Sequence, residues 1–413
     1  MNSKKITHYF SVVIFILWST WVGADTFHYN NILIGDRATG MGGAYTAISD
    51  DASGMFYNPA GIVFSEDKKL SASVNAFHST KTTYDGVLGG GDWSRESSDL
   101  LPNFFGLTRK LGDHYFGFSY AVTDSVVENQ DSNFVLPGIP QFTVNVNNRD
   151  TTLVVGPSWA KALSDTLNIG VTLYLHQRDR ELISNQWATF SDTSTQWQNI
   201  YTENEETGFN TIIGLMWSPT IEYSFGLSLS QTSISSSSNQ IQSTCVSEEN
   251  SVAIQGTLCP SVAPTITKTS AKRSLPTNLR LGFAYFPSDK LLLDVDVSFH
   301  QTSKDDFADR KATTNLAVGI EYYMAQNWAL RGGLFTNRSN SASIKSGQTN
   351  QDEHIDLNGV SVSMTRFSKE SSFSFGISTM SGSGEAQVIA NNPEIQDVDH
   401  SATTFYISSS HSI

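Results

Sequence analysis

The stretch Leu291–His300, LLLDVDVSFH, decides the fold class of this 413-residue chain. One set of alternating positions is entirely apolar: Leu291, Leu293, Val295, Val297 and Phe299. The intervening set is mostly polar: Leu292, Asp294, Asp296, Ser298 and His300. Successive side chains of a β-strand point to opposite faces, so this pattern predicts a strand with one apolar and one polar face.

The same alternation recurs along the chain after residue 66. It predicts fourteen strands, near residues 68–78, 103–110, 113–123, 149–161, 166–178, 207–218, 222–232, 274–286, 290–301, 313–323, 328–338, 354–367, 372–381 and 401–411. The parity changes around Asn358 and Gly359, which predicts a β-bulge there.

The connections between these strands alternate in length without exception. The short ones lie near residues 111, 162–165, 219–221, 287–289, 324–327 and 368–371, and the long ones at 79–102, 124–148, 179–206, 233–273, 302–312, 339–353 and 382–400. Aromatic residues such as Trp217 and Tyr285 crowd the short turns, which favours an interfacial girdle over ordinary strand packing. Outer-membrane barrels have short periplasmic turns and long external loops. We therefore expect an all-β protein, a 14-stranded antiparallel transmembrane β-barrel.

The composition excludes several classes of protein. With 39% hydrophobic and 16% charged residues, the chain is too polar for a bundle of membrane helices and too apolar for a disordered chain. It has 26 Lys and Arg against 40 Asp and Glu, a net charge of −14, which argues against a nucleic-acid partner.

Residues 1–24 have the features of a secretory signal peptide. Lys4 and Lys5 precede an apolar run at 10–22, and Val22-Gly23-Ala24 ends in small residues. A membrane anchor is the alternative, but the run is shorter than the roughly 20 residues that span a bilayer. In an exported chain, the two cysteines Cys245 and Cys259 predict a disulfide rather than free thiols or a zinc site.

Residues 35–61, GDRATGMGGAYTAISDDASGMFYNPAG, lack the strand alternation and form a separate element. A phosphate-binding loop is excluded because Met41 stands where its lysine would be. Glycines permit tight turns and close backbone packing, and a fourteen-stranded barrel has a lumen wide enough to need a plug. We expect a signal peptide at 1–24, an N-terminal plug at 25–66 and the barrel at 67–413.

This element resembles the long-chain fatty-acid transporter (FadL) family of outer-membrane proteins, which also contains aromatic-hydrocarbon uptake channels. The resemblance lies in R-A-x-G-M-G-G-A-Y-x-A at 37–47, in Asp50-Asp51-Ala52 and in Asn58-Pro59-Ala60-Gly61. It implies that the segment is a luminal hatch, and that apolar ligands captured outside leave sideways through a gap in the wall. The residues it assigns to the hatch are Arg37, Gly40, Gly42, Gly43, Asp50, Asp51, Asn58, Pro59 and Ala60.

Two further sets of residues are candidates for ligand contact. In the family, the third external loop helps to form a capture groove, which here implicates Trp187, Phe190, Trp197 and Tyr201; a loop that folds onto its neighbours is the alternative. The polar-face arginines Arg280 and Arg331 suit a ligand carboxylate, although luminal charges most often form structural salt bridges.

No residue pattern indicates catalysis. Asp50 and Asp51 have no accompanying nucleophile, and the nine histidines show no metal-binding spacing. A barrel lipase or protease is the enzymatic alternative, but nothing marks out one serine. We expect a monomer without cofactor or metal in the outer membrane of a Gram-negative bacterium, with periplasmic termini, in contact with outer-membrane lipid. It would take up hydrophobic small molecules passively, with long-chain fatty acids ahead of aromatic hydrocarbons. The alternatives are a structural or secretion-associated barrel that binds a protein partner, and a surface adhesin using residues 233–273.

Overall fold

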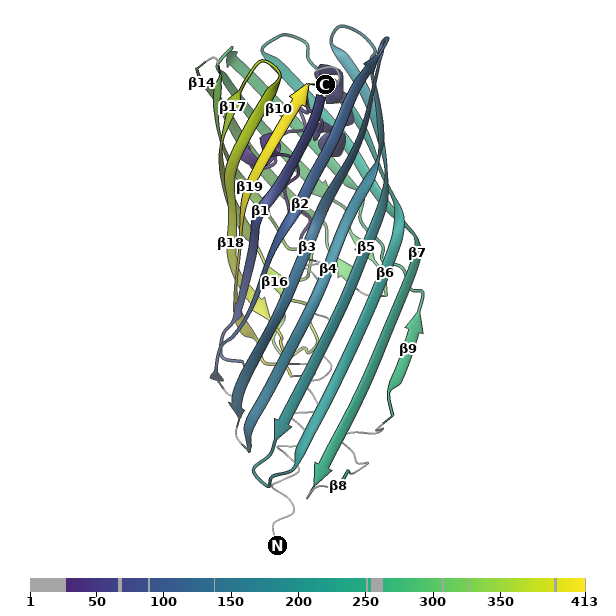
Figure 1. The fold of residues 1–413 in the computed structure, drawn as a ribbon, viewed down its shortest axis with the longest axis vertical. Helices are drawn as coiled ribbons and strands as arrows, with labels where there is room; N and C mark the ends of the chain where they lie inside the picture. Colours follow the sequence, from purple (N-terminus) through teal and green to yellow (C-terminus); the bar gives the residue numbers. More distant parts are fainter. Residues whose placement is uncertain are drawn as a thin grey trace.

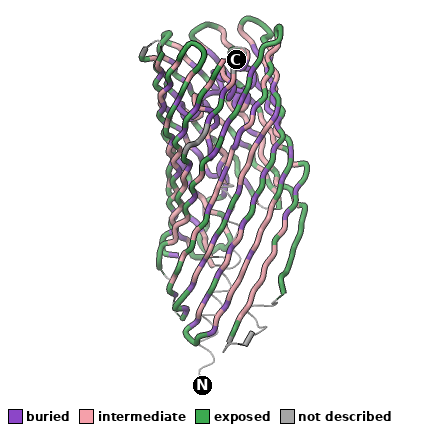
Figure 2. The backbone as a smooth tube through the Cα atoms, viewed as in Figure 1, coloured by how far each residue is buried: buried purple, intermediate pink, exposed green. Residues whose placement is uncertain are grey.

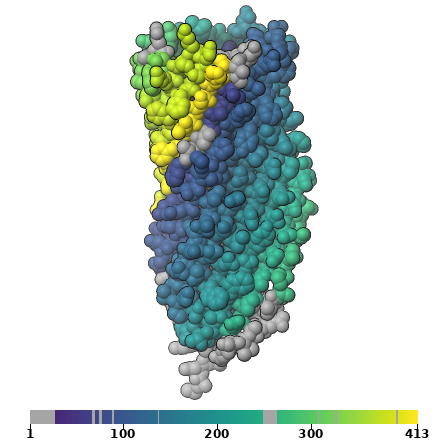
Figure 3. Space-filling view, in the orientation of Figure 1, coloured from purple at the N-terminus to yellow at the C-terminus, as the bar shows by residue number. Residues whose placement is uncertain are grey.

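The computed structural model describes residues 27–65, 69–87, 90–136, 138–249, 252–253, 263–306, 308–325, 327–389 and 392–412. The expected signal peptide and Cys259 lie outside these residues. One antiparallel sheet closes on itself through the pairing of the first and last strands, which lie side by side in Figure 3. The fourteen strands of the closed wall, in order around it, are β1 (Lys69–Tyr84), β2 (Trp93–Leu111), β3 (His114–Leu136), β4 (Ile139–Ala162), β5 (Leu167–Thr189), β6 (Thr195–Trp217), β7 (Tyr223–Glu249), β10 (Asn278–Ser288), β11 (Leu291–His300), β14 (Thr313–Ala325), β15 (Trp328–Asn337), β17 (Leu357–Phe367), β18 (Ser371–Ala386) and β19 (Gln396–Ser412).

Short strands supplement this wall. They are β8 (Val252–Ala253), β9 (Thr265–Thr269) and β16 (His354–Ile355), together with the separate pair β12 (Ser303–Lys304) and β13 (Asp309–Arg310). The predicted fourteen-stranded antiparallel barrel is confirmed.

The wall carries apolar side chains on the outside and polar ones inside. On β11 the apolar set at Leu293, Val295 and Val297 is exposed, whereas Asp294 and Asp296 are buried. This alternation runs along each strand in Figure 2. Further exposed apolar residues on neighbouring strands include Leu281, Phe283, Leu316, Val318, Ile320, Tyr322, Val360 and Val362. An apolar outer face around a polar lumen is the pattern of a barrel that spans a membrane.

The strands reach different distances from the short turns. All six short turns lie where the sequence predicts them, but the long loops expected at 124–148 and 179–206 are mostly strand, because β3 to β7 continue for 23 to 27 residues. Figure 1 shows these strands extending furthest at the end away from the C-terminus. The outward side chains of this extension are mostly polar, so the apolar alternation that predicts a strand is absent there.

The bulge expected at Asn358 and Gly359 is wrong. Both residues stay in continuous register with β15 and β18, and Gly359 continues the inward face. The ring of Phe335 occupies the space beside Gly359, within 2.6 Å of where a Cβ at Gly359 would stand. The missing side chain interrupts the apolar and polar pattern in the sequence, although the strand itself is continuous.

Residues 27–65, called the N-terminal segment below, form no strand. They contain α2 (Asp36–Gly40), α3 (Gly54–Tyr57) and the 3-10 helix η1 (Pro59–Phe64), which lie inside the barrel near the short-turn end in Figure 1. No helix among the described residues is long and apolar enough to cross a membrane. The C-terminal strand ends beside the short turn at residues 368–370, whereas the Phe27 carbonyl accepts a hydrogen bond from Asn340, beyond the other end of β15. The periplasmic location of the termini stays a prediction.

Candidate functional site

A belt of wall glycines makes room for the N-terminal segment. At eight inward-facing glycines, a Cβ would lie 2.1 to 2.8 Å from an atom of this segment. They are Gly106, Gly117, Gly170, Gly214, Gly226, Gly282, Gly319 and Gly333, one each from β2, β3, β5, β6, β7, β10, β14 and β15. The segment therefore packs with its backbone against the wall on most sides of the lumen.

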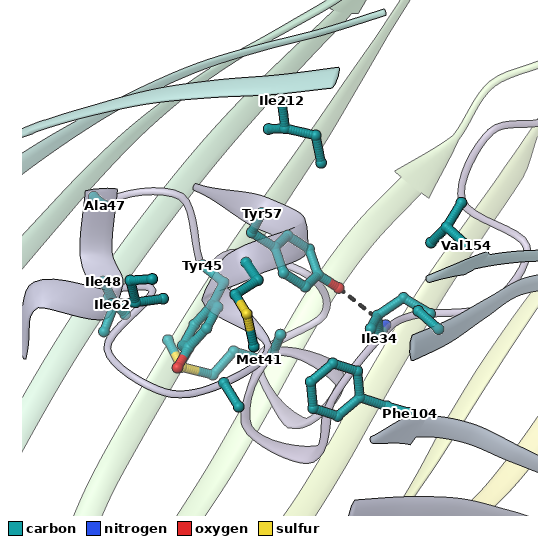
Figure 4. Close-up of a cluster of buried hydrophobic side chains, with 14 of the residues drawn as sticks. Ile34, Met41, Tyr45, Ala47, Ile48, Tyr57, Ile62, Phe104, Val154 and Ile212 are labelled. Carbon is teal, nitrogen blue, oxygen red and sulfur yellow. Dashed lines mark hydrogen bonds between the residues drawn. The ribbon is translucent and has the colours of Figure 1, made fainter. Parts of the chain in front are cut away.

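An apolar cluster fills the centre of this packing (Figure 4). Met41, Tyr45 and Ile62 of the N-terminal segment are fully buried, and Phe104 and Ile212 of the wall belong to the same cluster. The Tyr57 hydroxyl accepts a hydrogen bond from the Ile34 amide at 3.1 Å, drawn as a dashed line in Figure 4. Burial of each large side chain is worth about 1.5–3 kcal/mol. The segment is thus held by a core of its own.

Asn58 ties the segment to β6. Its side-chain amide donates to the Thr46 carbonyl at 2.9 Å and to the Leu215 carbonyl at 3.0 Å, and its oxygen accepts from the Ala60 amide. Pro59 begins η1, where its missing N–H costs nothing. The chain bends at Asn58 into η1, and this bend contacts the barrel wall.

A charged network joins α2 to β14 and β15 of the wall. The Arg37 side chain donates to Glu321 of β14 at 2.7 Å and to Asp50, which also accepts from the Tyr45 hydroxyl at 3.0 Å. Arg331 completes the network through Glu321 at 3.3 Å. Glu321 is fully buried, so these partners compensate a carboxylate that would otherwise be costly to bury.

The other predicted hatch residues have local roles. Gly42 and Gly43 adopt left-handed backbone conformations with φ of 69° and 86°, which favour glycine. A Cβ at Gly40 would lie 2.1 Å from the Ser363 hydroxyl. The Asp51 side chain accepts hydrogen bonds from the Ser53 amide and hydroxyl, closing a turn.

The two arginines predicted to meet a ligand carboxylate are both engaged by other groups. The Arg280 guanidinium lies over the rings of Phe56 and Tyr57, at 5.5 and 5.2 Å from their centroids. Arg331 bonds to Glu321 and to Thr365. The structure places both arginines at the interface with the N-terminal segment, which favours the structural alternative for them.

A second apolar cluster lines the lumen beyond the N-terminal segment. It combines side chains of the long strands with side chains of β15 to β19: Leu136, Ile139, Phe142, Val144, Val146, Leu182, Phe190, Phe335, Leu357, Met380 and Ala402. A small pocket at its inner edge lies between the start of the N-terminal segment, at Asn31 and Leu33, and Phe335 and Met380 of the wall. Part of this end of the lumen is therefore apolar.

Arginines stand directly beside this apolar cluster. Arg178 donates to both oxygens of Asp150, at 2.9 and 2.6 Å, and Arg273 donates to Glu206 at 2.8 Å. Arg180 lies 3.7 Å from Asp150 and only two residues from Leu182 on the same face of β5. Three guanidiniums thus face two carboxylates.

This group lies beyond the apolar outer band, which on β5 ends at Leu175. Burial opposes ionisation of Asp150, but Arg178 and Arg180 outweigh it and lower the pKa of the carboxyl. Burial lowers the pKa of Arg180 to about 10; the attraction of Asp150 opposes this and the repulsion of Arg178 adds to it. The three guanidiniums and two carboxylates of this group together carry one more positive than negative charge.

The predicted capture residues are divided between the two faces of the wall. Three of them lie on paired strands rather than in a loop, with Trp187 of β5 directly opposite Trp197 of β6 and Tyr201 on the same outward face, whereas Phe190 directly follows the end of β5. Trp187 is 44% exposed, whereas Phe190 turns inward into the apolar cluster and is 7% exposed. Phe190 alone among the four lines the lumen.

The wall is incomplete between β2 and β3. Their backbone pairing runs only from Leu111 and His114 to Phe104 and Ala121, so residues 93–103 and 122–136 have no backbone partners across this junction. Pro102 of β2 lacks an N–H, and β3 has a bulge between Val122 and Asp124. Both irregularities disfavour a continuous ladder.

The remaining site predictions concern cysteines and metals. Cys245 lies on β7 in register with Gln198 of β6, and because Cys259 is outside the described residues the disulfide stays a prediction. Within the described part of the chain, no group of three or more His, Cys, Asp or Glu residues is arranged to hold a metal ion.

The fold and the site define a fourteen-stranded membrane barrel whose lumen is filled by its own N-terminal segment. The same fold is found in a FadL homologue from Pseudomonas aeruginosa, at 14% identity and a TM-score of 0.66 over 92% of this chain and 98% of that one. The toluene transporter TodX from Pseudomonas putida matches at 14% identity and a TM-score of 0.67 over 93% of this chain and all of that one. The Ralstonia pickettii toluene transporter TbuX matches at 14% identity and a TM-score of 0.61 over 92% of this chain and 98% of that one.

At this identity the likeness is one of fold, and it confirms the fold predicted from the N-terminal motif. No family model matches the chain, and no curated protein matches it.

Proposed function

We propose that this protein is an outer-membrane channel for the passive uptake of hydrophobic small molecules, with long-chain fatty acids as its principal ligands. The observation that carries the proposal is the junction between β2 and β3, where two adjacent long strands of the wall lose their backbone pairing, in a barrel that is filled by its N-terminal segment. A polar solute crosses a barrel along its axis, but the N-terminal segment occupies the axis here. An apolar solute can leave through the wall into lipid.

The position of the junction suits this route. Leu101 and Phe104 of β2 and Val122 of β3 are buried beside it, and Leu100 is 65% exposed on the outer face at the same level. Apolar side chains thus continue from the lumen to the lipid-facing surface. A hydrophobic ligand following them keeps apolar contacts throughout, which lowers the cost of transfer.

The choice of fatty acids rests on the arginines beside the apolar cluster. Phe142 and Leu182 offer an apolar surface to an acyl chain, and Arg180 lies within two residues of Leu182. Guanidinium groups bind carboxylates through paired, charge-assisted hydrogen bonds. A neutral hydrocarbon such as toluene uses the apolar cluster alone, so the aromatic ligands of similar barrels are the second candidate.

The N-terminal segment would then act as a hatch, which we place at residues 25–66, ahead of the barrel at 67–413. Its many contacts with the wall close the route to the short-turn end of the lumen. We expect this end to face the periplasm, because short turns do so in outer-membrane barrels.

The test is uptake by cells that lack their own fatty-acid channel and express this chain. We expect radiolabelled palmitate to enter at least ten times faster than in cells with an empty vector, and a polar sugar of similar mass to enter no faster. Faster uptake of toluene than of palmitate would favour the aromatic alternative. Unchanged uptake of both, with a folded barrel and a co-purifying protein partner, would replace transport with the structural or secretion-associated alternative.

A further inference from the structure

The outward face of the extension of β5 and β6 carries aromatic side chains beyond the level of the lipid. The apolar outer band on β5 ends at Leu175, and Trp187 lies further along the same face with 44% exposure. Trp197 of β6 is directly opposite Trp187, and Tyr201 is directly opposite Ile183. Apolar patches that face water and are rimmed by polar residues mark sites of interaction.

A row of hydrogen-bonded amides separates the two aromatic pairs. The Asn199 side chain donates to the Asn185 oxygen at 2.8 Å, and the Asn185 side chain donates to the Asn145 oxygen at 3.2 Å. Asn145 in turn donates to Asp131 of β3. Each amide nitrogen has a second N–H and each oxygen a second lone pair, so the row presents donors and acceptors that repeat at the strand spacing of about 4.8 Å. We call this row, together with Ile183, Trp187, Trp197 and Tyr201, the amide–aromatic face.

The combination of rings and amides on this face is one that recognises sugars. The C–H face of a sugar ring packs against an aromatic ring, and the hydroxyls at its edge both donate and accept hydrogen bonds, as a side-chain amide does. Trp197 and Tyr201 are about 13 Å apart along β6, which is room for more than one sugar ring. The Trp187 indole donates to the Thr189 hydroxyl at 3.3 Å, so its ring is held in place. The amide–aromatic face therefore suits an uncharged stretch of an oligosaccharide.

The position of the face indicates where these sugars come from. It continues the face of β5 and β6 on which Leu175 and Phe209 belong to the apolar outer band. A lipid whose acyl chains pack against the band therefore has its head group on the same face. The lipid of the outer leaflet of an outer membrane is a glycolipid, with sugars above its acyl chains. The amide row lies about 33 Å along β5 beyond Leu175, so only the sugars remote from the acyl chains reach it.

Four carboxylates lie between the band and the amide–aromatic face. Asp179 and Glu181 of β5 are directly opposite Glu205 and Glu203 of β6. The phosphate groups of a glycolipid lie at this level, and like charges at this spacing repel each other. Divalent cations offset the repulsion, because carboxylate and phosphate oxygens are both ligands of such cations. The acidic rows therefore accommodate a glycolipid whose phosphates carry divalent cations.

We propose that the amide–aromatic face binds the core oligosaccharide of the glycolipid that surrounds the barrel. The rings of Trp187, Trp197 and Tyr201 stack on sugar faces, and the amide row bonds to the hydroxyls. This inference goes beyond the proposed uptake and shares with it only the orientation of the barrel in the outer membrane. It gives the extension a partner on its outside, whereas the proposed ligand route lies inside.

The test measures the binding of two lipopolysaccharides to the purified barrel in detergent that contains magnesium. One carries a complete core oligosaccharide, and the other is a deep-rough form that keeps lipid A and only its innermost sugars. Both present lipid A to the apolar band, so a difference between them reports the outer sugars. We expect the Kd of the wild type to be at least tenfold lower for the complete core. Equal Kd values would overturn the inference.

Trp197→Ala/Tyr201→Ala removes the two rings of β6. It should raise the Kd for the complete core at least tenfold and leave the Kd for the deep-rough form unchanged. Phe209→Ala is the matched control, because Phe209 is an aromatic residue on the same face of β6, 50% exposed within the apolar band. This control should leave the ratio of the two Kd values unchanged. Heat-modifiable migration checks that each barrel is folded.

Asn185→Leu tests the amide row with the rings in place. It interrupts the row between Asn145 and Asn199 and should reduce the preference for the complete core at least threefold. Gln177→Leu, on the same face of β5 but next to the apolar band, should keep the wild-type preference. An unchanged preference in either folded variant of the face would overturn the inference, as would a protein partner that Trp197→Ala/Tyr201→Ala loses while both Kd values stay the same. Failure of the wild type to take up palmitate, with its preference for the complete core intact, would instead contradict the proposed function.

Discussion

Gly226 of β7 and Gly282 of β10 are directly opposite each other in register, and the backbone of the N-terminal segment passes against both. The Thr46 carbonyl oxygen lies 2.1 Å from where a Cβ at Gly226 would stand, and the Ala47 nitrogen lies 2.7 Å from the corresponding point at Gly282. A side chain at either position cannot share this space with the segment. The absence of two side chains thus fixes where the segment sits.

Gly226→Leu should displace the N-terminal segment. Backbone atoms that approach to 2.1 Å cannot give way as a flexible side chain would, so we expect the segment to leave the wall and the conductance in planar bilayers to rise severalfold. Gly332→Leu is the control, because the nearest heavy atom to its Cβ position is at 3.6 Å. Wild-type conductance in a folded Gly226→Leu barrel would show that the segment does not close the lumen.

Asn58→Leu should loosen the same segment at β6. It leaves the Thr46 and Leu215 carbonyls without their donor, at a cost of about 1–3 kcal/mol for each buried acceptor. Pro59→Leu should have a smaller effect in the same direction, since the first position of η1 needs no N–H donor. Conductance and heat-modifiable migration measure opening and barrel folding separately. If both variants conduct like the wild type, the motif serves only as a turn into β1.

Arg180→Gln should weaken fatty-acid uptake selectively. Loss of a charge-assisted hydrogen bond of about 1.5–3 kcal/mol raises the KM for palmitate about tenfold or more, whereas toluene uptake should stay unchanged. Arg149→Gln is the control, because Arg149 lies on the outer face of β4 and is exposed. An equal loss for palmitate and toluene would indicate a structural role for Arg180.

Phe190→Ala and Trp187→Ala should have different effects on ligand uptake, although the sequence predicts that both aromatic side chains capture ligand. Phe190 is buried in the luminal apolar cluster, and its removal should reduce uptake severalfold. Trp187 points outward and is 44% exposed, so its removal should leave uptake within about a factor of two. Initial uptake rates at low palmitate concentration distinguish the two. The reverse order would place the capture surface on the outside of the extension.

The sequence allowed the parity of each strand to be predicted because membrane-facing positions must be apolar. Val295 and Asp294 alternate as expected, and each short turn lies where the alternation stops. The extension of β3 to β7 was missed because residues such as Asn145 and Asn185 face solvent there and carry no apolar signal. The alternation of apolar and polar residues is present only where the outer face of a strand contacts lipid, and it therefore ends where that face meets water.

The site was harder to predict than the fold because it depends on which strands pair. Gly226 and Gly282 lie in strands that the sequence predicts, at 222–232 and 274–286, but their contacts with Thr46 and Ala47 span 180 residues or more. Likewise, Pro102 marks a strand irregularity, yet only the pairing shows that β2 and β3 part beside it. Arg180 lies two residues beyond Arg178, at a position where the sequence predicts a loop.

The network around Arg37 has a consequence for the order of assembly. Arg37 lies near the start of the chain, but Glu321, to which it bonds, lies on β14, more than 280 residues later. Such distant contacts form slowly, since the intervening chain must first be ordered. The segment that is synthesised before every strand can therefore take its final position only after β14, the tenth of the fourteen strands of the wall, has joined the sheet.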